Sequence, residues 1–67
     1  MSEIFIRLPE VKSRTGLSRA TIYRKIEDGT FPSQISLGSQ AVGWIESEID
    51  KWIDTQIKAA RLREVPR

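Results

Sequence analysis

The sequence predicts a mainly α-helical fold with three helices and a small two-stranded β-hairpin. Apolar residues recur at helical spacing in two short segments near the N-terminus and in one long segment near the C-terminus. Between them, residues 34–45 alternate polar and apolar side chains around a Gly-Ser-Gln turn, as a hairpin does. Two helices joined by a tight turn and followed by a hairpin form a winged helix-turn-helix.

The first helix is predicted from Leu8 to about Arg14. Pro9 suits its first turn, because a helix has no partner there for the N–H that proline lacks. Thr15-Gly16 then ends the helix. The preceding apolar run, Ile4 to Ile6, reads either as a strand or as a hydrophobic lead-in.

The second helix is predicted between two strong boundary signals. Ser18 is a good N-cap, since its hydroxyl can accept a hydrogen bond from the N–H of residue 20 or 21. Gly29 is a good C-terminal stop. Ile22 and Ile26 lie four residues apart and therefore share the face directed at the core.

The hairpin is predicted over residues 34–45, with its tip near residues 38–40. The third helix is predicted from Glu46 or Ser47 to about Ala60. Trp44 and Trp52 both sit in apolar periodic patterns, so they are expected in the core rather than on a base-stacking surface. The apolar side of the third helix comprises Ile45, Ile49, Trp52, Ile53 and Ile57.

The length of 67 residues predicts one domain over residues 1–67, with a core of about 5–60 and a flexible basic tail at 61–67. The chain has no Cys and no His, which excludes a disulfide framework, the usual zinc sites and Cys- or His-based catalysis. It also has no phosphate-cradling glycine loop. We therefore expect no enzyme activity, no cofactor and no metal.

No apolar run approaches the length of a membrane span, and the N-terminus lacks the features of a signal peptide. The expected protein is cytoplasmic, with no membrane partner. Its charge is strongly polarised: residues 12–25 hold five bases and no acid, whereas residues 46–57 hold four acids and one base. This pattern favours a polyanion on one side of the molecule and places the third helix on the other.

The rotational phase of the second helix indicates which of its residues could contact DNA. With Ile22 directed inward, Ala20 and Arg24 point outward, and Arg19 lies near the edge. Arginine can grip guanine, and a methyl group can meet that of thymine. A solvated basic face is the alternative interpretation. The candidates for base edges are Arg19, Ala20 and Arg24, and those for phosphates are Ser18, Thr21, Tyr23 and Lys25, with Lys12 and Arg14 in addition.

The hairpin could act as a wing, or it could simply close the core. Residues 30–45 contain no Lys or Arg, so a contact there would use backbone N–H groups and small polar side chains. The candidates for this wing contact are Ser36, Ser39 and Gln40.

Spaced motifs across residues 5–60 resemble the AlpA-like phage regulatory family. They include Leu8-Pro9-Glu10-Val11, Thr15 to Arg24, Gly29-x-Phe31-Pro32 and Ala41-Val42-Gly43-Trp44. The family is related to excisionases and to MerR-type DNA-binding domains. The resemblance implies a winged helix-turn-helix with its recognition helix at Ser18–Asp28 and its wing at Ile35–Trp44. The tip carries Ser39-Gln40 where the family often has a basic residue.

The resemblance implies a sequence-specific transcriptional regulator of a prophage or mobile element, with double-stranded DNA as its partner. One alternative is an excisionase that bends attachment-site DNA and contacts integrase. Another is a protein-interaction adaptor that uses the third helix or the tail. Because one small helix-turn-helix supplies limited contact with DNA, self-association on repeated half-sites is also expected.

Overall fold

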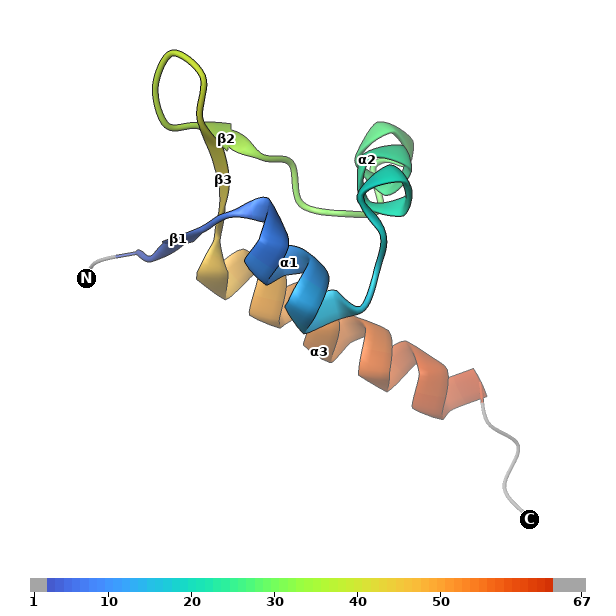
Figure 1. Cartoon of the computed structure of the whole chain (residues 1–67). Helices are drawn as coiled ribbons and strands as arrows, with labels where there is room; N and C mark the ends of the chain where they lie inside the picture. The colour runs from blue at the N-terminus through green and yellow to red at the C-terminus, as the bar shows by residue number, and fades with distance from the viewer. Residues whose placement is uncertain (1–2, 64–67) are drawn as a thin grey trace.

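The computed structural model describes residues 3–63, which form three helices and a small antiparallel sheet (Figure 1). The predicted fold class, a mainly helical winged helix-turn-helix, is confirmed. None of the described helices has the length and apolar character that a membrane crossing requires. The elements in chain order are β1 (Phe5–Ile6), α1 (Leu8–Thr15), α2 (Arg19–Asp28), β2 (Ile35–Ser36), β3 (Val42–Ile45) and α3 (Glu46–Arg63).

The sheet has the strand order β1-β3-β2, and both pairings are antiparallel. Phe5 lies opposite Ile45, which shows that the N-terminal apolar run is a strand rather than a lead-in. Strand β3 passes into α3 with no residue between them, and the N–H of Glu46 donates to the carbonyl of Ile4 at 2.8 Å. The sheet and α3 are therefore tied directly to each other.

The helix ends follow the predicted signals closely. Gly16 and Gly29 adopt left-handed φ angles of 74° and 79°, which favour glycine at a helix C-terminus. Helix α1 extends one residue beyond the predicted end, to Thr15. Helix α3 continues past Ala60 to Arg63, so residues 61–63 of the predicted tail are helical, and the rest of that tail lies outside the described residues.

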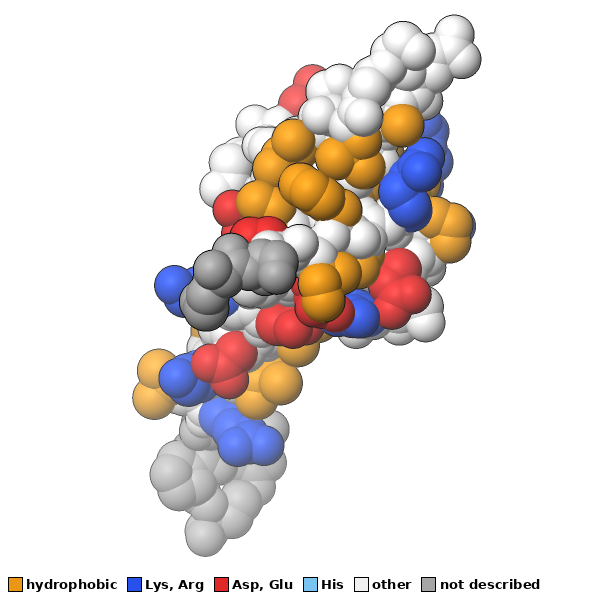
Figure 2. Space-filling model, turned by 90° about the vertical axis from the view of Figure 1, so that its left-hand side faces the viewer, with side chains coloured by type: hydrophobic (Ala, Val, Ile, Leu, Met, Phe, Trp, Pro, Cys, Tyr) orange, Lys and Arg blue, Asp and Glu red, His pale blue; other side chains and the backbone are white. Residues whose placement is uncertain are grey.

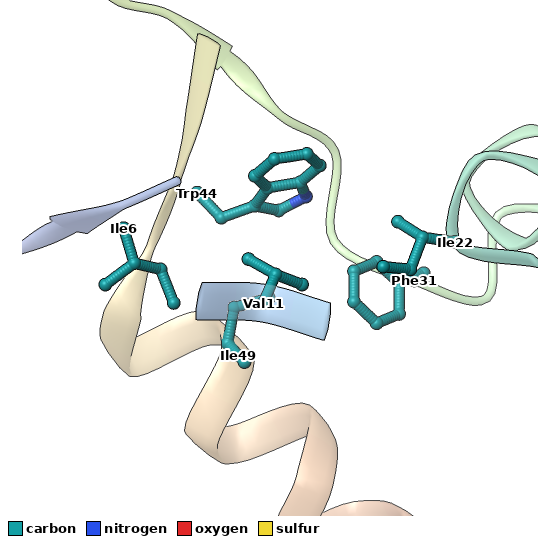
Figure 3. Close-up of a cluster of buried hydrophobic side chains, with 6 residues drawn as sticks. All are labelled: Ile6, Val11, Ile22, Phe31, Trp44 and Ile49. Carbon is teal, nitrogen blue, oxygen red and sulfur yellow. The ribbon is translucent and has the colours of Figure 1, made fainter. Parts of the chain in front are cut away.

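The core is a cluster of buried side chains to which every element except β2 contributes (Figure 3). Half-buried apolar side chains, including Leu17 and Ile26, pack around it. A domain this small buries only a limited apolar area, so each core position carries a large share of the stability. The buried residues are Ile6, Val11, Ile22, Phe31, Trp44 and Ile49.

Both tryptophans hydrogen-bond to the segment between α2 and β2. The indole N–H of Trp44 donates to the carbonyl of Pro32 at 3.0 Å, and that of Trp52 donates to the carbonyl of Thr30 at 2.7 Å. The rings of Phe31 and Trp52 meet edge to face, with their centroids 4.7 Å apart. Trp44 is fully buried as expected, whereas Trp52 is half-buried at the margin of the core. These contacts fix where α2 sits relative to the sheet.

Replacing Ile49 by alanine should lower the free energy of unfolding by about 2–5 kcal/mol, because the change leaves a cavity among fully buried side chains. Urea denaturation followed by circular dichroism measures this loss. Ile57→Ala is the matched control on the same helix, since Ile57 is 45% exposed and its truncation should change stability by about 0.5 kcal/mol or less. Equal losses for the two variants would contradict this account of the core.

Candidate nucleic-acid interface

Helix α2 presents the predicted outward face. Ile22 is fully buried, while Arg19, Ala20 and Arg24 are exposed. Ala20 and Arg24 lie one turn apart and therefore share a face of the helix. The predicted phase of α2 is confirmed.

An aromatic side chain links the edge of this face to the core. The guanidinium carbon of Arg19 lies 5.0 Å from the centroid of the Tyr23 ring, within the range of a cation–π contact. The half-buried Tyr23 ring in turn meets Trp44 edge to face, at 6.2 Å between centroids and 66° between planes. Arg19 is thus steered by a side chain that packs on the buried tryptophan.

Ser18 caps α2 as predicted. Its hydroxyl oxygen accepts from the N–H of Thr21 at 3.2 Å, and its hydroxyl donates to Oγ1 of Thr21 at 3.0 Å. The Ser18 hydroxyl therefore has a structural role, while the Thr21 hydroxyl keeps its own proton for donation. The first turn of α2 also carries backbone N–H groups that suit an anion.

The two candidate lysines lie in different settings, Lys12 in α1 and Lys25 in α2. Lys12 is exposed in the last turn of α1. Lys25 is half-buried and lines a groove between α2 and α3 together with Leu17 and Ile57. A long stem packed in this way leaves the ammonium group at the rim, where it can reach an anion.

Arg14 is occupied by carboxylates of its own chain. Its Nε lies 2.9 Å from Oε2 of Glu10, its Nη2 lies 2.8 Å from Oε2 of Glu46, and its Nη1 lies 3.3 Å from Oδ1 of Asp50. The hydrogen bonds with Glu10 and then Glu46 raise the pKa of Arg14 above its ordinary value. A phosphate would have to compete with three carboxylates for this guanidinium. The geometry therefore gives Arg14 a structural role, as an ion-pair tie between α1 and α3.

The acidic residues of α3 are correspondingly divided. Glu46 and Asp50 pair with Arg14, and the Asp50 side chain remains 60% exposed. Glu48 is exposed, and Asp54 pairs with Lys58 at 3.2 Å on the exposed side of the helix. The sequence could have signalled part of this cluster, because Glu10 and Arg14 are spaced four residues apart on one helix.

The hairpin tip is held by short-range bonds. The Ser36 hydroxyl donates to the carbonyl of Gly38 at 3.0 Å, and the N–H of Leu37 donates to the carbonyl of Ala41 at 2.8 Å. Ser39 and Gln40 are exposed at the tip. Figure 1 shows the tip and α2 projecting from the same side of the molecule, with α3 on the other side. Of the candidate wing residues, Ser36 thus shapes the tip and the other two are free to make contacts.

The family model described as prophage CP4-57 regulatory protein (AlpA) matches residues 4–57. The chain belongs to this AlpA family. The DNA-binding transcriptional activator AlpA of Escherichia coli K12 is 46% identical, across 79% of this chain and 84% of the relative. An uncharacterized protein, ORF88 of enterobacteria phage P4, is 49% identical across 82% of this chain; the match covers 62% of the phage protein, which is under two thirds of its length.

In this AlpA family member, Arg14→Gln should lower the thermal unfolding midpoint, because it leaves the carboxylates of α1 and α3 without their shared cation. The matched control is Lys58→Gln, which removes a single exposed pair and should have little effect. In about 0.5 M NaCl, the difference between the unfolding midpoints of the two variants should become smaller, since salt screens partly exposed charges. Identical midpoints for the two variants would argue against the tie.

Proposed function

We propose that this protein is a prophage regulator that binds double-stranded DNA sequence-specifically, with α2 in the major groove. This proposal rests on the exposed row formed by Arg19, Ala20 and Arg24 on α2. That helix follows α1 after a tight turn, as the second helix of a helix-turn-helix does. A helix-turn-helix reads DNA through the outward face of its second helix. The K12 relative's description as a DNA-binding transcriptional activator supports the same role.

The residues of the row differ in the chemistry that they offer to base edges. Arg24 has five N–H donors in a planar fork and can bond O6 and N7 of guanine together. The Ala20 methyl group beside it can contact the methyl group of thymine. Because this side chain is small, the helix can approach the base edges closely. Arg19 is restrained by the Tyr23 ring, which lowers the entropy that it would lose on binding.

Phosphate contacts would surround this row. Thr21 and Tyr23 offer hydroxyl groups, and Lys12 and Lys25 offer ammonium groups. The N-terminus of α2, shaped by the Ser18 cap, adds backbone donors. We leave Arg14 out of the contact set because its guanidinium already binds three carboxylates.

The wing would contribute without charge. Ser39 and Gln40 are exposed at a tip that projects on the same side as α2 (Figure 1). Their polar side chains and the backbone N–H groups of the tip can reach the phosphates next to the groove that α2 occupies. This contact would position the protein rather than read the sequence.

The K12 relative is described as a transcriptional activator, which favours transcriptional control over excision as the biological use of this binding. Such a regulator would act in the bacterial cytoplasm at promoters of the element that encodes it. Footprinting on the DNA that flanks its gene distinguishes the two uses. Protection upstream of a promoter supports the proposal, whereas repeated protection within an attachment region supports an excisionase.

Arg24→Ala should weaken specific binding by about 1–3 kcal/mol and relax discrimination at one base pair, because it removes a base-edge contact. Selection of binding sites from a random duplex pool, followed by titration of the selected site, measures both effects. Unchanged affinity together with unchanged sequence preference would contradict the proposed orientation of α2.

Lys25→Ala is the matched comparison on the same helix. It should weaken binding to all sequences equally and lower the salt slope of log K by about 1, because one phosphate contact is lost. Titrations at several salt concentrations, with selected and scrambled duplexes, measure this. A loss confined to the selected sequence would instead make Lys25 a base-reading residue.

A further inference from the structure

The outer face of the sheet is apolar and uncovered within the described residues. Phe5 and Ile45 form one cross-strand pair on it, and Ile35 and Gly43 form the next, because these residues alternate with the inward-facing Trp44. The Leu37 side chain folds over Gly43, where an added Cβ would lie 2.7 Å from its Cδ1. Phe5 is nevertheless 49% exposed, and Ile35 and Leu37 are each 37% exposed.

This face continues into a groove beside α3. The groove has a volume of about 550 Å³ and runs between residues 32–35 and one side of the helix. Ile35 belongs to both surfaces, and Trp52 forms part of the groove wall. Figure 2 shows hydrophobic side chains gathered on this side of the molecule. A contiguous apolar surface bordered by charged groups is typical of a protein interface.

The position of this surface leaves it accessible during the proposed DNA binding. Helix α2 packs through Ile22 on the core side of the sheet, where Trp44 is buried. The residues of the outer face alternate with Trp44 along β3, so they lie on the opposite side of the sheet. The row formed by Arg19, Ala20 and Arg24 and this apolar surface could therefore be occupied together.

We propose that a second copy of this chain docks on the outer sheet face, related to the first by a twofold axis. In such an isologous contact each surface meets the same surface of its partner, so the apolar face of one subunit covers the apolar face of the other. The rim supplies charge complementarity, because Glu48 and Lys51 both line the groove and lie one helical turn apart. A twofold axis sets Glu48 against the partner subunit's Lys51, and the reverse pair forms by symmetry.

This inference extends the proposed function, because a pair of subunits would place two α2 helices on repeated half-sites. The face is small, so the dimer is weak in solution. Binding to two adjacent half-sites raises the effective concentration of the two subunits and makes the weak contact productive. The contact itself can be measured without DNA, which separates its failure from a failure of the proposed function.

Sedimentation equilibrium of the full chain, at about 10 μM to 1 mM, tests the contact over the range expected for a weak complex. The expected result is a reversible dimer that Phe5→Glu and Ile35→Glu both abolish. Leu62→Glu is the matched control, since Leu62 is 86% exposed near the end of α3 and its replacement should leave the dimer intact. Circular dichroism confirms that each variant is folded.

Charge reversal tests the twofold register. Glu48→Lys and Lys51→Glu should each weaken the dimer by about tenfold, because each reversal replaces two attractions with two repulsions. The double variant restores opposite charges and should recover the dimer. A double variant that stays monomeric overturns the twofold pairing.

A chain that is monomeric at every concentration, or a dimer that Phe5→Glu and Ile35→Glu leave intact, overturns the proposal. The monomeric result would assign the apolar face to a different protein. Loss of DNA binding in a chain that still dimerises would overturn the proposed function alone.

Discussion

The burial of Trp44 is the constraint on which the rest of this structure depends. Its side chain is fully enclosed, so its indole N–H must find a partner, and the carbonyl of Pro32 provides one. That bond fixes the segment that follows α2, and Tyr23 of α2 rests against the ring. The orientation of the candidate DNA-binding helix is therefore a consequence of core packing. The position of the Arg19 side chain depends on the same packing, because its guanidinium contacts the Tyr23 ring.

The charged residues then give the molecule two different sides. The bases of residues 12–25 would repel one another on a free surface, yet Arg14 is withdrawn from them and neutralised by Glu10, Glu46 and Asp50. This cluster joins α1 to the start of α3 and masks acids that would otherwise oppose a polyanion. The exposed bases Arg19 and Arg24 belong to α2, which projects from the same side of the molecule as the hairpin tip (Figure 1).

The order of elements and most of their ends could be predicted from local signals. Ser18 as a cap and Gly16 and Gly29 as stops act within a few residues, so their effects are legible in the sequence. The strand at Phe5 could not be decided, because its partner Ile45 lies forty residues away. The occupation of Arg14 was missed for the same reason, since two of its three carboxylates come from α3. The exposed row on α2 was predictable because the phase of a helix follows from Ile22 and Ile26 alone.

Amide NMR of the isotopically labelled chain, titrated with a duplex that contains one selected site, tests the central claim most directly. The account predicts that the largest shifts fall on the turn and first half of α2, residues 16–25, and on the hairpin tip, residues 38–40. The amides of residues 46–56 in the acidic half of α3 should change little. Shifts concentrated in that half of α3, with α2 unaffected, would contradict the account.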